Sequence, residues 1–417
     1  MKLLIIFIIT IILFMIDKFP VASVATAGCI ATVLFGICTP TEIMSGFTND
    51  IVLIVFGTEI LGTAFNESGV SSKISKLIIK ITKENEKKLI LFAGLIAAVL
   101  SAFLNNQVVC SFMMIICIHI SKTVKEIHVR NVTLPVIYCA IMGGQCTLVG
   151  APATLIASSV AENITGNGFS MFELLPMGLI LLIIGLLWIY FVSYQKSGEI
   201  WGNCEQVPAE PEKAIACADK KKMIVTLLAG VVMILLFITN LVSVGTASVI
   251  SGLICIFGGA VSQKKAFEKM DWNILIWLAC SISMASALNQ SGSVQEVCDF
   301  LVNYIPSDIS PVLLLSIFTI LSVIISNFIA NTTTVIMLLP FALQLAEAYS
   351  LNPASFLVAV TMGAGLAILT PLSSGFIGMT VRVGYRFQDY VRYGMGIQIL
   401  LTAMIIVLTC MFYPITA

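Results

Sequence analysis

The sequence has little charge for its length. Of its 417 residues, 11% are charged and 59% are hydrophobic, whereas a soluble domain carries about 25% charged residues. This composition excludes a soluble enzyme and predicts a polytopic membrane protein that lies in a lipid bilayer. The charges also balance, with 22 basic and 22 acidic residues, so no basic face for nucleic acid is expected.

Side chains that hold metals or perform catalysis are scarce as well. The only two histidines, His119 and His128, lack partners at ligand spacing. The 12 cysteines are scattered through apolar stretches without a C-x-x-C pair, which is typical of small core residues. No nucleophile has a placed base, and no glycine-rich phosphate loop precedes a lysine. A membrane-embedded enzyme or a structural polytopic protein is therefore the less favoured interpretation, and no cofactor is expected.

Long apolar stretches, in contrast, recur along the whole chain. Stretches that could cross a bilayer, about 20 residues with some shorter or tilted, lie at 3–16, 21–38, 51–66, 132–162, 173–195, 222–240, 244–262, 272–290, 354–381 and 393–414. The first resembles a signal sequence but has no small-residue cleavage site, so we expect it to be a span. Two further stretches, 88–120 and 310–346, are too long for one helix and polar in the middle, which predicts two re-entrant hairpins.

The two halves of the chain repeat each other on either side of a charged linker, 196–221. Three blocks recur in the same order about 220 residues apart. The pairs are 46–69 with 269–292, 101–109 with 326–334, and 168–178 with 384–394. The sequence therefore predicts an all-α membrane protein of two repeats, residues 1–195 and 222–417. Each repeat is expected to hold five spans, a re-entrant hairpin (88–120 or 310–346) and a broken helix (132–162 or 354–381).

The distribution of basic residues predicts the topology. Five spans is an odd number, so the second repeat is expected to be inverted relative to the first. When successive loops are assigned to opposite sides of the membrane, starting from the N-terminus, all of the 22 Lys and Arg residues except Lys2 fall on one side. The positive-inside rule makes that side cytoplasmic. We expect a multi-pass protein of the cell membrane with both termini outside and the linker 196–221 in the cytoplasm. Segments 71–88 and 293–305 are amphipathic and are expected to lie along the membrane surface, ordinary loops being the alternative.

Four polar interruptions are candidates for a binding site. Two are the hairpin tips, 105–107 and 331–334, and two are Gly- and Pro-containing breaks, 143–155 and 363–375. Inverted repeats with interrupted helices are typical of secondary transporters. Free carbonyls and Asn oxygens suit a small cation such as sodium, while helix N-termini suit an anion. Neither acids nor buried Lys or Arg are expected at the tips. We therefore expect helix dipoles and neutral polar groups to hold the anion. Packing of helices through polar residues is the alternative reading.

At these interruptions the sequence resembles the divalent anion–sodium symporter family of the ion transporter superfamily. The resemblance rests on "DW" at 271–272, the Asn-containing tips, "GGxxTxxGxP" at 143–152, "LTPLS" at 369–373 and "GYRFQDYVRYG" at 384–394. It implies an elevator mechanism, a homodimer, two sodium sites and a site for a small anionic substrate between them. The implied sodium-binding residues are Ser101, Asn105, Asn106, Gly150, Ser326, Ala330, Asn331 and Leu369. The implied substrate-binding residues are Asn106, Gln107, Ala151, Pro152, Asn331, Thr332, Thr370 and Pro371.

The first tip departs from the Ser-Asn-Thr pattern of the resembling family. It reads Asn105-Asn106-Gln107, and the second tip reads Ala330-Asn331-Thr332. The central Asn and the Ser five residues earlier are kept, which predicts conserved cation sites and an altered substrate shell. The favoured function is sodium-coupled uptake of a small anion, a di- or tricarboxylate or sulfate. An arsenite-efflux or sodium/proton antiporter of the same superfamily is the alternative, kept open by the acids Glu59 and Asp50.

Overall fold

The chain is helical throughout the part that the structure describes. A computed structural model describes residues 2–16, 20–83, 85–124, 126–166, 168–201, 219–239, 241–290, 309–371 and 373–416. Within these ranges the β-type contact is a single isolated antiparallel bridge between Leu351 and Thr416. The predicted all-α fold class is confirmed.

The helices of the first half include most of the apolar stretches expected there. They are α1 (Lys2–Ile16), α2 (Val21–Leu34), α3 (Pro40–Met44), α4 (Asp50–Glu67), α5 (Val70–Thr82), α6 (Glu86–Phe103), α7 (Asn106–Thr123), α8 (Val129–Gly144), α9 (Pro152–Thr165), α10 (Leu175–Trp188) and α11 (Tyr194–Trp201). A 3-10 turn, η1 (Ser45–Thr48), follows α3, and a π turn, η2 (Ile189–Ser193), joins α10 to α11.

The second half continues the same pattern. Its helices are α12 (Lys220–Thr239), α13 (Val244–Phe257), α14 (Gln263–Lys269), α15 (Trp272–Gln290), α17 (Pro311–Ser326), α18 (Asn331–Ala348), α19 (Pro353–Gly365), α20 (Gly375–Gly378) and α21 (Phe387–Phe412), with a 3-10 turn, η3 (Met379–Val383), after α20.

Several helices have the length and apolar surface of membrane spans. Among the described residues, four helical stretches are long and apolar enough to cross a bilayer: Asn106–Thr123, Leu175–Trp201, Lys220–Thr239 and Phe387–Phe412. A fifth is formed if the bent pair Pro40–Thr48 and Asp50–Glu67 counts as one span. Helix α12 exposes large apolar side chains along its length, among them Leu228, Val231 and Leu235, as expected for a helix that faces lipid.

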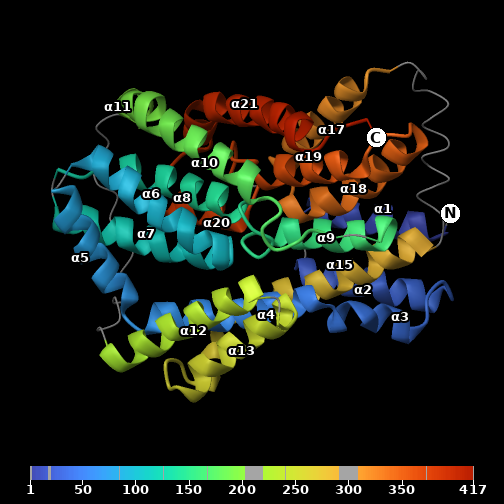
Figure 1. Ribbon diagram of the computed structural model, residues 1–417, viewed down its shortest axis with the longest axis horizontal. Helices are drawn as coiled ribbons and strands as arrows, with labels where there is room; N and C mark the ends of the chain where they lie inside the picture. The colour runs from blue at the N-terminus through green and yellow to red at the C-terminus, as the bar shows by residue number, and fades with distance from the viewer. Residues whose placement is uncertain are drawn as a thin grey trace.

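Each half contains a pair of helices joined by a short tip. Helices α6 and α7 meet at residues 104–105 and both pack against α8, and α17 and α18 meet at 327–330 and both pack against α19. In Figure 1 the first group (α6, α7, α8) and the second (α17, α18, α19) lie toward opposite ends of the long axis. The side from which each pair enters a membrane stays a prediction, as does the inverted orientation of the repeats.

The two long stretches expected to be broken helices are interrupted at glycines and prolines. Helix α8 ends at Gly144 and α9 begins at Pro152, while α19 ends at Gly365 and the short helix α20 begins at Gly375. Proline suits the first position of α9 because the N–H that it lacks has no partner inside a helix there. The helix pairs and these breaks interlock, since α9 packs against α18 and α20 packs against α7.

The structure describes both ends of the chain and one of the two amphipathic segments. Figure 1 places both termini toward the same end of the long axis, with α5 at the other end. The expected arm 71–88 is occupied by α5 and the start of α6. The second expected arm, 293–305, and most of the linker 196–221 lie outside the described residues. The membrane side of each terminus stays a prediction.

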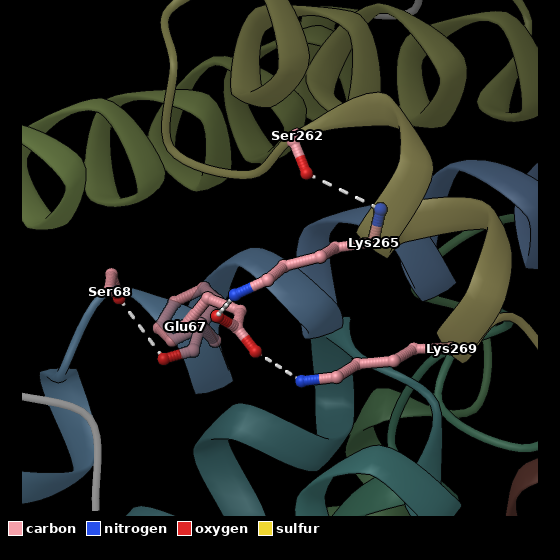
Figure 2. A network of polar contacts seen from close by, with 6 residues as sticks. Glu67, Ser68, Ser262, Lys265 and Lys269 are labelled. Carbon is pink, nitrogen blue, oxygen red and sulfur yellow. Dashed lines mark hydrogen bonds and ion pairs between the residues drawn. The ribbon is translucent and has the colours of Figure 1, made fainter.

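An ion-pair network joins the end of α4 to α14. Glu67 accepts from Lys265 Nζ at 2.9 Å and also contacts Lys269. Figure 2 shows both lysines reaching from α14 toward this one carboxylate. The contact with Glu67 raises the pKa of Lys265, because the carboxylate stabilises the ammonium ion. The network joins the first half of the chain to the second.

Candidate functional site

The first tip is built by a helix start that is capped from within. Asn105 has a φ of −52° and a ψ of 131°, which is not helical, and its Oδ1 accepts from the backbone N–H of Gln107 at 2.9 Å, so Asn105 is the N-cap of α7. The side chains of Asn105 and Asn106 are buried, at 3% and 1% exposure. Their amides therefore do not face lipid, where unpaired amides would cost several kcal/mol.

Oxygen atoms gather around Asn106. Ser101 Oγ donates to Asn106 Oδ1, and the backbone N–H of Asn106 donates to the carbonyl of Gly150 at 3.1 Å. A side chain at Gly144 would collide with the Asn106 amide, and one at Gly150 would collide with the carbonyls of Gly144 and Ser101. The glycines thus allow the chain to bring hydroxyl, amide and carbonyl oxygens together. These are hard oxygen ligands, which fit a sodium ion held by unwound backbone.

The second tip repeats this arrangement. Ser326 Oγ donates to Asn331 Oδ1 at 2.9 Å and lies 2.9 Å from the carbonyl of Ala364, near the end of α19. Asn331 is the first residue of α18. The N-cap Ala330 offers no side-chain hydrogen bond, so the capping oxygen that Asn105 supplies in the first tip has no counterpart here.

A threonine ties each tip to the break that follows it. Thr147 Oγ1 donates to the carbonyl of Ala102, and Thr370 Oγ1 donates to the carbonyl of Asn327. Thr147 was not among the predicted site residues, although the motif "GGxxTxxGxP" contains it. Thr370 was predicted to bind substrate, and the structure directs its hydroxyl to the backbone of the second tip.

Asn327 is a second residue that the sequence prediction missed. Its Oδ1 accepts from the backbone N–H of Leu369 at 2.7 Å, and its side-chain amide donates to Val323 within α17. Leu369 was among the predicted sodium-binding residues. The contact with Asn327 holds the backbone at Leu369 against the tip that carries Ser326.

Several of the predicted substrate residues stand at the starts of helices. Ala151 and Pro152 are the N-cap and first residue of α9, and Thr332 lies in the first turn of α18 with 8% exposure. Pro371 follows Thr370 in the second break and is half-buried. Two of these residue groups therefore lie on helices that are in contact, because α9 packs against α18. Helix N-termini favour anions, but the substrate role of these residues stays a prediction.

Two carboxylates lie against the first tip, contrary to the expectation of a tip without acids. Asn105 Nδ2 donates to Glu59 Oε1 at 3.4 Å, and Gln107 Nε2 lies 3.5 Å from Asp271 Oδ2. Glu59 belongs to α4 and is 6% exposed, while Asp271 precedes α15. The expectation was wrong because it considered only residues close in sequence, and these acids lie 46 and 164 positions from the amides that they contact.

Gln145 joins the two breaks. It follows α8 directly, is 1% exposed, and its Nε2 lies 3.4 Å from the carbonyl of Gly365 at the end of α19. A side chain at Gly365 would collide with this amide. Its Oε1 is buried and has no hydrogen-bond partner among the residues described here. Gln145 therefore offers an acceptor at the contact between the halves, and it was not among the predicted site residues.

Comparison with known proteins places this arrangement among membrane transporters. The family model described as citrate transporter matches residues 11–363. The sodium-dependent dicarboxylate transporter SdcS of Staphylococcus aureus is 22% identical over 394 residues, covering 86% of this chain and 75% of SdcS. The uncharacterized transporter sll0640 of Synechocystis is 29% identical over 182 residues, which are 44% of this chain and 30% of that protein's own length.

Two solved structures share the fold. The YdaH transporter of Alcanivorax borkumensis has a TM-score of 0.63 at 12% identity, covering 89% of this chain and 87% of its own. Neisseria gonorrhoeae MtrF, whose structure is described as illuminating a class of antimetabolite efflux pumps, has a TM-score of 0.61 at 14% identity and covers 99% and 95%. At these identities the likeness concerns the fold alone.

Proposed function

The chain belongs to the citrate transporter family, and we propose that it carries a small anion, a di- or tricarboxylate or sulfate, into the cell together with sodium. The family makes it a multi-pass membrane transporter and not an enzyme. The substrate, the coupling ion and the direction of transport are our proposal.

One observation carries the proposal of sodium coupling: the same oxygen cluster occurs at both tips. Ser101 with Asn106 and Ser326 with Asn331 make the same side-chain contact across five residues, each beside a glycine-rich break. Packing of helices alone would not require the same Ser–Asn pair twice, each time next to a helix break. The relative SdcS, which is named as a sodium-dependent dicarboxylate transporter, supports the same assignment.

In this proposal the anion lies between the two tips, near the starts of α9 and α18. The backbone N–H groups of these helix starts and the positive end of each helix dipole would hold it. The two sodium ions offset its charge, which links binding of the anion to binding of sodium. We further propose an elevator movement and a homodimer, which rest on the family resemblance.

Isotope uptake into proteoliposomes tests the proposal directly. Purified protein is reconstituted, and uptake of labelled citrate, succinate and sulfate is measured with an inward sodium gradient and with potassium in its place. We expect uptake of at least one of these anions that requires sodium. Equal uptake in potassium would reject sodium coupling, and proton movement on addition of sodium, reported by an internal pH dye, would favour the antiporter alternative.

A further inference from the structure

Glu59 is an acidic residue in the apolar middle of α4. Its side chain is 6% exposed, and within the described ranges no Lys or Arg forms an ion pair with it. A carboxylate inside a membrane helix is costly and marks a functional position by default. Among the described residues, its hydrogen-bond donor is Asn105 Nδ2 at 3.4 Å, on the first tip.

The second half lacks this pair. In the repeated blocks, Glu59 corresponds to Ile282 and Asn105 corresponds to Ala330. Ile282 is a buried residue of α15, and Ala330 is the N-cap of α18 without a capping side chain. The Ser–Asn pair of the cation cluster is thus present in both halves, whereas the contact between a carboxylate and a capping amide is specific to the first.

A short path of contacts leads from Glu59 to the first oxygen cluster. The Asn105 amide donates to Glu59 through Nδ2 and accepts from the Gln107 N–H through Oδ1. The contact with Glu59 therefore fixes which end of the amide faces the helix start, since a carboxylate accepts only. The next residue, Asn106, presents its Oδ1 to Ser101 and its N–H to Gly150.

We propose that Glu59 is a positioning residue that acts through Asn105: it orders the start of α7 and so raises the affinity of the first oxygen cluster for sodium. The inference rests on the proposed function in so far as the bound cation is sodium. The second cluster, whose N-cap is an alanine, has no such support.

Sodium dependence of uptake in Glu59 variants tests the inference. Glu59→Leu removes the acceptor, and we expect the sodium concentration for half-maximal uptake to rise about tenfold while the maximal rate is kept. Glu59→Gln keeps an acceptor oxygen without the charge, so a smaller rise is expected. An unchanged sodium concentration for half-maximal uptake in Glu59→Leu would overturn the inference, as would a fall in maximal rate alone, which indicates a structural role.

A double variant decides whether Glu59 acts through Asn105. We expect Asn105→Ala to raise the half-maximal sodium concentration by itself and Glu59→Leu to add little in that background, because the contact is already lost. If the two effects multiply in full, Glu59 acts independently of Asn105 and the inference is wrong.

Glu67 is the matched control on the same helix. Its carboxylate is paired with Lys265 and Lys269 at the end of α4 (Figure 2), and its hydrogen bonds among the described residues go to these two lysines rather than to a tip. Glu67→Gln removes the same charge from α4, and we expect its half-maximal sodium concentration to equal that of the wild type. A rise equal to that of Glu59→Leu would assign the effect to the net charge of α4 and overturn the inference.

Hydrogen exchange separates this inference from the proposed function. The amide of Gln107 is bonded to Asn105 Oδ1, so Glu59→Leu is expected to speed exchange in a peptide covering 101–109, whatever ion the transporter uses. If the wild type transports an anion without sodium, the proposed coupling fails while faster exchange still supports positioning by Glu59. Unchanged exchange at 101–109 overturns the inference even where transport is sodium-dependent.

Discussion

Ser326 and Asn331, five residues apart on either side of the second tip, are joined by a hydrogen bond of 2.9 Å from Ser326 Oγ to Asn331 Oδ1. The same hydroxyl lies 2.9 Å from the carbonyl of Ala364. Since α17 ends at Ser326 and α18 begins at Asn331, one side chain connects the tip to the end of α19. Ser101 makes the corresponding contact with Asn106 in the first tip.

Removal of this hydroxyl tests the second oxygen cluster. We expect Ser326→Ala to raise the sodium concentration for half-maximal uptake about five- to tenfold, equivalent to loss of one hydrogen bond or ligand of about 1 kcal/mol. Ser316→Ala is the control, because Ser316 bonds only within α17, to Val312. Equal sodium dependence in Ser326→Ala and the wild type, measured in proteoliposomes, would contradict a cation site at this tip.

The close approach of Gly144 to Asn106 gives a steric test of the first cluster. A methyl group at Gly144 would occupy the position of the Asn106 amide, so Gly144→Ala must displace the side chain that carries the proposed ligand oxygen. We expect sodium-dependent uptake to be lost, while the protein still elutes as a folded species. Gly230→Ala in α12 is the control, because a methyl group there meets nothing within 4 Å. Normal uptake by Gly144→Ala would show that the position of Asn106 does not matter.

The threonine ties predict an effect on stability. Thr147→Val keeps the shape of the side chain but leaves the carbonyl of Ala102 without its donor. We expect thermal unfolding in detergent to show a loss of about 1–3 kcal/mol, the cost of an unpaired buried polar group. Thr370→Val is expected to act in the same direction through Asn327. Two variants as stable as the wild type would mean that water replaces these donors.

Much of the helical pattern could be predicted from the sequence, and its errors have identifiable causes. The apolar stretch 21–38 is longer than α2, which ends at Leu34 because Gly36 takes a φ of 67° and turns the chain. The span expected from 393 begins six residues earlier, at Phe387. Polar residues occupy the first turn of α21, where the Asp389 side chain accepts from the Arg386 N–H at 2.8 Å. Hydropathy recognises neither a capped start nor a glycine turn.

The contacts of the candidate site that could be predicted are those between residues close in sequence and those present in both sequence repeats. The Ser–Asn pairs lie within five residues of each other, and the repeat of the sequence drew attention to both. Asn327 was not predicted at all, and Glu59 was named only as an acid of the antiporter alternative, without its contact with the first tip. The contact of Glu59 depends on which face of α4 meets α7, which no periodicity of an almost wholly apolar helix fixes. Asn327 acts through the backbone of Leu369, and a backbone partner leaves no mark in the sequence.

The contact of Gln107 with Asp271 leads to a prediction about the anion. Asp271 Oδ1 accepts from the N–H groups of Asn273 and Ile274, so the carboxylate caps α15 and would stay in place without Gln107. Gln107→Thr removes the amide that faces Asp271 Oδ2 and leaves a bare negative charge beside the first tip. We expect the anion concentration for half-maximal uptake to rise about fivefold by repulsion. The double variant with Asp271→Asn keeps a capping side chain. We expect it to return the anion concentration for half-maximal uptake to the wild-type value. If the double variant restores nothing, Gln107 contacts the anion directly rather than shielding it from Asp271.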